Sequence, residues 1–115
     1  MYKVLFLSPM IPSDRPMETA AFFGGALGFN IKSFDEEYHI CEKDGMSVHI
    51  QPAGENIGEM SIYIEVDHID GLWTEMEPKV AHLRHKAPFD RPYGMREVHV
   101  DVPATKTMLF LGQSL

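Results

Sequence analysis

Polar side chains that alternate with apolar ones along three strand-like segments are the residues of this chain best placed to do chemistry. In a strand, alternate residues share one face, so each segment presents a row of polar groups. A face that carries imidazole, amide, phenol and carboxylate groups suits the binding of a polar small molecule. The alternative interpretation of the same polar row is a sheet face that contacts only solvent and binds no ligand. The residues expected to line the ligand site are His49, Gln51, Tyr63, Glu65, Glu97 and His99.

The sequence contains no recognisable catalytic group. The six histidines form no His-x3-His or Cys–His pattern. No nucleophile is paired with a base, and no glycine-rich phosphate loop or CxxC pair is present. Catalytic residues therefore stay unassigned. A displaced metal site of His49, His99 and either Glu97 or Glu65 remains open, because these residue types ligate metals.

Charge and composition restrict the kinds of partner. The formal net charge is −7 and the basic residues form no patch, which argues against nucleic acid. The negative field mildly favours a cationic ligand. No apolar run approaches the roughly 18 residues of a membrane span, and the N-terminus lacks a signal-peptide pattern. The single cysteine, Cys41, fits a reducing compartment, so a cytoplasmic location is expected.

The segment Ile11–Phe29 predicts the end of a strand, a short helix and an exit into the next strand. Ser13 or Asp14 can accept hydrogen bonds from the first helical turn, and Pro16 stands where a missing N–H costs nothing. Gly28 can adopt the left-handed conformation that ends a helix. This part of the chain is therefore a strand–helix–strand unit.

The remaining pattern predicts the same unit a second time. A second helix is expected from Asp67 or His68 to about Glu77, and Asp44-Gly45 predicts a tight hairpin turn. Lys86–Gly94 is expected to be a loop because it carries two prolines and a glycine. The predicted strands are Tyr2–Ile11, Asn30–Phe34, Tyr38–Lys43, Met46–Gln51, Met60–Val66, Val80–Arg84, Met95–Val102 and Thr107–Gly112.

This order is βαβββ repeated, in a single domain over residues 1–115 with one repeat near 1–54 and the other near 59–113. One unit of about 50 residues cannot bury both faces of its sheet alone. We therefore expect an α+β fold in which the two units form one large curved mixed sheet. The helices would cover the convex face and leave a concave cleft for a ligand.

Several sequence motifs resemble those of the vicinal oxygen chelate superfamily. This superfamily contains glyoxalase I, extradiol dioxygenases, and fosfomycin- and bleomycin-resistance proteins. The first half has Asp14, then Ala20-Ala21-Phe22-Phe23, then Leu27-Gly28-Phe29. The resemblance is closest to the bleomycin-resistance branch, because the motif Ile-Pro-Ser followed by Thr-Ala-Ala-Phe is typical of that branch. The second half adds Arg91-Pro92-Tyr93-Gly94-Met95-Arg96-Glu97-Val98, although the turn after it, Asp101–Lys106, departs from the usual pattern.

The resemblance also indicates where a metal would bind. Metal-dependent members take one ligand each from the first and last strand of both halves. The neighbouring motifs assign these positions to Leu7 or Ser8, His49, Ser61 and Leu109. Only His49 is a good ligand, whereas a metal site needs three or four. The chain is therefore expected to bind no metal and no other cofactor.

Three functions follow as hypotheses. The resemblance to bleomycin-resistance proteins implies a homodimer that sequesters a small molecule in a cleft between two subunits. The first alternative is a metal-dependent lyase or dioxygenase of the same superfamily. The second is a non-catalytic binding or regulatory module. Whether the protein is an enzyme, and which ligand it takes, are left open by the sequence.

Overall fold

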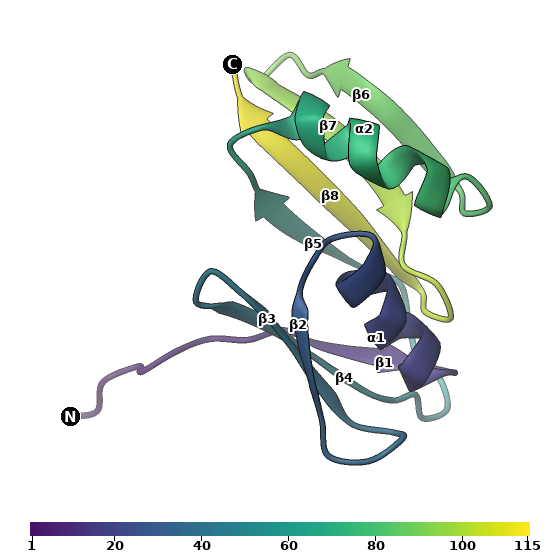
Figure 1. The fold of residues 1–115 in the computed structure, drawn as a ribbon. Coiled ribbons are helices and arrows are strands. Elements are labelled where there is room, and N and C mark those ends of the chain that lie inside the picture. Colours follow the sequence, from purple (N-terminus) through teal and green to yellow (C-terminus); the bar gives the residue numbers. More distant parts are fainter.

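Two four-stranded sheets, each covered on one face by a helix, make up the fold (Figure 1). The computed structural model describes residues 1–115. The first half contains β1 (Met10–Ser13), α1 (Pro16–Gly25), β2 (Asn30–Ser33), β3 (His39–Lys43) and β4 (Met46–Pro52). The second half contains β5 (Met60–Glu65), α2 (Ile69–Val80), β6 (His85–Asp90), β7 (Met95–Asp101) and β8 (Thr107–Ser114).

The strand order is the same in both halves, which confirms the predicted α+β class with two βαβββ repeats. The first sheet has the order β1-β4-β3-β2 and the second has β5-β8-β7-β6. In each sheet the first strand runs parallel to the fourth, and the other pairs are antiparallel. The strands do not join into one sheet, however. β1 and β5 are edge strands, and the single curved sheet expected from the sequence is two sheets within one chain.

Helix α1 begins at Pro16 as its sequence predicts, but neither Ser13 nor Asp14 caps its first turn. The N-cap position is Arg15, and the Ser13 hydroxyl accepts a hydrogen bond from the Arg15 N–H at 3.0 Å, just outside the helix. At the other end Gly28 has φ = +74°, and the Phe29 N–H bonds to the Phe23 carbonyl at 3.0 Å. The Gly28 N–H also donates to the Gly24 carbonyl at 3.2 Å, which is the five-to-one bond of an αL termination and requires the left-handed residue.

Helix α2 is stabilised at its start by another part of the chain. Neither Asp67 nor His68 caps it with a side chain, contrary to expectation. The Ile69 N–H instead donates to the Gln113 side-chain oxygen, 2.9 Å away on β8. The helix includes Pro78 and continues to Val80. Neither helix is long and apolar enough to cross a membrane.

The predicted strands are confirmed at most positions, and the exceptions lie at edges. Asp44 and Gly45 both have positive φ, +52° and +80°, as a two-residue hairpin turn requires. The strand expected over Val80–Arg84 is wrong, because α2 ends at Val80 and the strand follows as β6. Most of β6 is exposed, and its pairing with β7 is irregular between Lys86 and Phe89. It therefore lacks the apolar alternation by which strands are recognised.

A single hydrophobic core joins the two halves. Sixteen buried apolar residues form one cluster that contains residues from both helices and both sheets. Three hydrogen bonds also link the halves: from the Asp14 N–H to the Ala104 carbonyl, from the Thr19 hydroxyl to the Pro103 carbonyl, and from Lys79 Nζ to the Gly25 carbonyl. The two repeats therefore pack against each other through a shared core.

The N-terminal residues 1–7, here called the arm, extend away from the rest of the chain (Figure 1). The strand predicted over Tyr2–Ile11 is wrong except at its end, since β1 begins at Met10. The arm makes no backbone hydrogen bond, and the body begins where the Ser8 hydroxyl bonds to the Ser47 carbonyl at 2.9 Å. Apart from the terminal Met1, five large apolar side chains of the arm are at least 69% exposed: Tyr2, Val4, Leu5, Phe6 and Leu7.

Candidate functional site

Four of the six expected ligand residues lie together on the face of the second sheet that is not covered by α2, here called the second open face. The pairing of the strands places Tyr63, Phe110 and His99 in one row across the sheet. Glu65, Gly112 and Glu97 form the adjacent row. The alternate residues Ile64, Val98 and Leu111 pack into the core under α2. The period of two read from the sequence therefore predicts this face correctly.

Glu97 lies on this face but, unlike the exposed Tyr63 and Glu65, it is buried. Its side chain is fully buried, and both carboxylate oxygens already accept hydrogen bonds. One bond comes from His99 Nε2 at 2.8 Å and the other, a short one, from the Tyr93 hydroxyl. The carboxylate is covered by its two partners in this chain, and direct contact of Glu97 with a ligand stays a prediction. Its role is to hold its two neighbours.

The charge on Glu97 is stabilised despite its burial. Desolvation raises the pKa of a carboxyl, but the hydrogen bonds from Tyr93 and His99, with Arg91 nearby, outweigh it. The net effect holds the pKa of Glu97 below its usual range. The reciprocal effect raises the pKa of Tyr93, mainly through its bond to the same carboxylate. Glu97 is therefore ionised at neutral pH.

Tyr63 lies across the second open face above a glycine. A Cβ at position 112 would collide with the Tyr63 hydroxyl, so Gly112 leaves the space that the phenol occupies. The Tyr63 side chain is 46% exposed. Partial desolvation raises its pKa, with the nearby carboxylates of Glu97 and Glu65 adding to the shift. Tyr63 therefore offers an aromatic surface and a neutral hydroxyl to a ligand.

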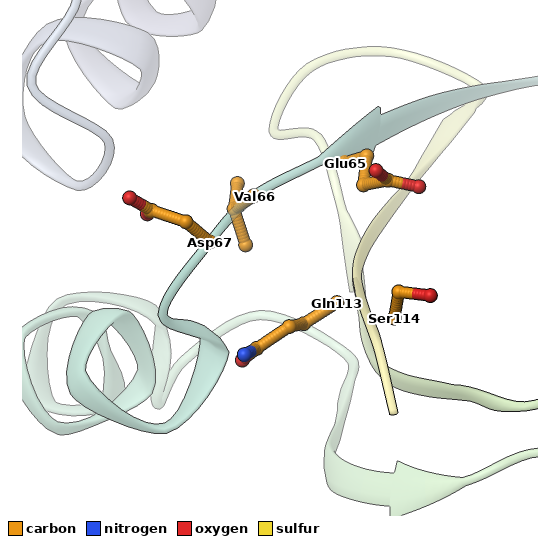
Figure 2. A pocket seen from close by; sticks show the side chains of 5 residues that line it. All are labelled: Glu65, Val66, Asp67, Gln113 and Ser114. Carbon is orange, nitrogen blue, oxygen red and sulfur yellow. The ribbon is translucent and has the colours of Figure 1, made fainter.

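Glu65 is exposed at the end of β5, beside an open hollow (Figure 2). Figure 2 shows its carboxylate and Ser114 directed away from α2, whereas Gln113 points toward the helix. The other residues around the hollow are Val66 and Asp67. Unlike Glu97, Glu65 forms no ion pair or hydrogen bond through its side chain in this chain, so it is available to a cationic group.

His49 and Gln51 lie on the corresponding face of the first sheet, here called the first open face. His49 Nδ1 is 2.7 Å from the Tyr38 hydroxyl, and the two rings meet edge to face at 5.8 Å. Gln51 is two residues further along β4 and half-buried. A hollow of about 360 Å³ adjoins His49; its lining includes Phe6, Ile40, Glu42 and Ser47.

The chain does not bring the two groups into contact. His49 and Gln51 belong to the first sheet, and the other four residues belong to the second. No hydrogen bond, ion pair or aromatic contact connects the first open face with the second. The polar residues expected to share one cleft thus form two separate surfaces.

The family's metal positions do not converge either. Leu109 is fully buried in the core, so the open face of β8 is carried by its neighbours Met108 and Phe110. A side chain at the fourth family position would have to lie on the open face, so that position falls on a neighbour of Leu109 rather than on Leu109 itself. Ser61 is on the second sheet, whereas His49 is on the first. No three His, Cys, Asp or Glu side chains lie close enough together to hold a metal ion.

Sequence reasoning missed three aromatic residues of the second open face. Phe110 stacks on His99 with ring centroids 3.9 Å apart, and Phe89 approaches the same imidazole edge-on at 5.0 Å. Tyr93 is held in the turn before β7, where the Arg91 guanidinium donates to its hydroxyl at 3.2 Å. The motif Arg91-Pro92-Tyr93-Gly94 is recognisable in the sequence, but only the fold shows that the Tyr93 hydroxyl bonds to Glu97.

Comparison with known structures finds proteins of the same fold. The sequence matches no family model and no curated protein. The structure resembles a bleomycin-binding protein from bleomycin-producing Streptomyces verticillus in complex with copper(II)-bleomycin, with a TM-score of 0.75 and 21% identity over 96% of this chain and 97% of that one. It also resembles TnmS3, an antibiotic-binding protein from Streptomyces sp. CB03234, with a TM-score of 0.79 and 12% identity over 100% and 99% of the two chains.

An enzyme has the same fold. Lactoylglutathione lyase from Agrobacterium tumefaciens gives a TM-score of 0.77 at 12% identity, with 98% of this chain and 96% of that chain covered. This chain therefore has the fold of the vicinal oxygen chelate superfamily, the glyoxalase, bleomycin-resistance and dioxygenase proteins, as its motifs predict. Bleomycin-binding proteins are among its structural neighbours. Because the fold hosts both binding proteins and enzymes, the site itself must decide the function.

Proposed function

We propose that this protein binds and sequesters a polar small molecule on its open sheet faces, without a catalytic metal. The observation that carries the proposal is the second open face, where buried Glu97 holds His99 and Tyr93 beside the exposed Tyr63 and Glu65. Buried hydrogen-bonded carboxylates fix the orientation of the groups around them, which is what a specific binding surface needs. Two structural neighbours are described as bleomycin-binding and antibiotic-binding proteins.

The ligand that fits this surface best carries positive charge. Glu65 is an exposed carboxylate without a partner, and Tyr63 offers the ring face that attracts cations. The net charge of −7 favours approach of a cation. Bleomycin-type glycopeptides are one candidate class, since a bleomycin-binding protein shares the fold.

The functional unit that we propose is a homodimer. One chain divides the expected ligand residues between two separate sheets, each with an open edge strand. It also exposes five large apolar side chains on the arm. A second copy would cover the arm and the sheet edges, and would set the first open face of one copy against the second open face of the other. The cleft would then contain residues from both subunits.

Calorimetry with a panel of cationic antibiotics and metabolites, including bleomycin, tests the binding function. We expect one member of the panel to bind, and Tyr63→Ala and Glu65→Gln each to weaken it by about tenfold, or about 1.4 kcal/mol. Glu75→Gln on α2 is the matched control and should leave the affinity unchanged. If the affected variants stay within about twofold of the wild type, the site lies on another surface.

The purified protein is also expected to contain no stoichiometric nickel, zinc, manganese or iron. His49 is the only good ligand among the family positions, because Ser8 and Ser61 offer only hydroxyls and the open face of β8 carries Met108 and Phe110. Elemental analysis after purification without added metal gives the measurement. About one ion per chain, lost in His49→Ala, would instead favour the metal-dependent lyase or dioxygenase.

A further inference from the structure

The imidazole of His99 is held on three sides within the second open face. Phe110 stacks on one side at 3.9 Å between centroids with a 35° tilt, and Phe89 meets it edge-on at 5.0 Å. Its Nε2 lies 2.8 Å from a carboxylate oxygen of Glu97. Because an ionised carboxylate only accepts hydrogen bonds, Nε2 must carry the proton.

The other ring nitrogen is left for a ligand. His99 Nδ1 forms no hydrogen bond within the chain. No buried side-chain nitrogen or oxygen lacks a partner in this protein, so the unpartnered Nδ1 of the part-exposed His99 is in contact with solvent. In a neutral imidazole with its proton on Nε2, Nδ1 presents a lone pair. The geometry therefore fixes a hydrogen-bond acceptor at a defined point of the surface.

Aromatic surface surrounds that acceptor. Phe110 lies between His99 and Tyr63 in one row of the sheet, and the exposed Tyr63 ring extends the row over Gly112. Rings stack in offset or edge-to-face arrangements, so a flat aromatic group can rest on this row. A polar substituent on its edge would then reach Nδ1.

We propose that the second open face contains a subsite for a planar aromatic group that bears an O–H or N–H donor directed at His99 Nδ1. The proposal rests on the small-molecule binding proposed above and names the chemistry of one part of the ligand. Glu97 acts here as a positioning residue, because it sets which nitrogen of His99 carries the proton. Glu65 remains the partner of a cationic group elsewhere on the same ligand.

Phenol and anisole are the probes, since they differ by the methyl group that removes the donor. NMR titration of the wild-type protein at about pH 8, where imidazoles are ordinarily neutral, should show phenol binding about fivefold more tightly than anisole. His99→Phe keeps the ring and should bind both probes equally. His82→Phe, at an exposed imidazole just after α2, should keep the preference for phenol.

The proton position of His99 gives a second readout that does not depend on a ligand. Nitrogen-15 shifts should show the Nε2–H tautomer in the wild type and a mixture of tautomers in Glu97→Ala. The Nδ1–H tautomer in the wild type would overturn the proposal. Equal affinity for the two probes, or no binding of either at about 10 mM, would overturn it as well.

The two proposals can fail separately. If a cationic compound of the calorimetric panel binds but the phenol preference is missing, only the aromatic subsite is wrong. If the phenol preference depends on His99 but no panel compound binds, the subsite stands and the sequestration of a cationic molecule does not.

Discussion

Deletion of residues 1–7 is expected to convert a dimer into a monomer without unfolding the chain. The arm makes no backbone hydrogen bond and contributes nothing to the buried core, so each subunit should keep its fold. Its five exposed apolar side chains can each contribute about 1.5–3 kcal/mol when a partner buries them. Loss of the arm should weaken dimerisation at least about 100-fold, or about 2.8 kcal/mol.

Light scattering on a sizing column measures this change. The wild type should have twice the 13.1 kDa mass of the chain, and the deletion variant should have that mass once. Leu5→Asp should act like the deletion, because Leu5 is 90% exposed within the chain and would have to be buried by the partner. Lys3→Ala in the same arm is the matched control and should leave the dimer intact. A wild type that runs as a monomer at micromolar concentration and above would contradict the dimer.

Replacement of Glu97 by alanine is expected to lower the free energy of unfolding by about 1–3 kcal/mol at pH 7. The substitution removes the acceptor of two hydrogen bonds, from His99 and Tyr93, inside the sheet. Glu65→Ala is the matched control on the same face. Since Glu65 is exposed and unpaired, that change should stay within about 0.5 kcal/mol of the wild type.

The Glu97 effect should depend on pH in a defined direction. The pKa of Glu97 is lowered in the folded state, so its contribution is present above the unfolded-state pKa of about 4.3. That contribution is lost as the pH falls through the folded-state pKa. Urea unfolding should therefore show a smaller difference between wild type and Glu97→Ala at about pH 3 than at pH 7. A difference that grows toward acid would mean that Glu97 is not held as an anion.

The parts of the fold that could be predicted are those encoded locally. Gly28 supplies a left-handed termination, and Asp44-Gly45 supplies a hairpin turn, because both need backbone conformations that few other residues adopt. The open faces follow from strand alternation alone, so the expected residues of each face do lie on it. These features depend on neighbours within a few residues.

The features that could not be predicted depend on distant parts of the chain. The arm has the apolar composition of a buried strand, but nothing in its own chain pairs with it. β6 is an exposed edge strand with Pro88 and an irregular register, so its sequence resembles a loop. Glu97 was expected to face a ligand because it alternates along the strand in step with His99, on the same face. Its burial arises from Tyr93 and His99, which the fold brings over it.

Mixing of subunits tests whether the ligand site is shared between two copies. His49→Ala damages the first open face and Tyr63→Ala damages the second, so each variant dimer should bind the calorimetric ligand weakly. When the two variants are unfolded, mixed equally and refolded, half of the dimers should be mixed, and each mixed dimer has one site with both wild-type faces. About one quarter of the wild-type number of sites should therefore recover full affinity. A mixture that binds no better than the two variants alone would contradict it, because the site would then lie within a single chain.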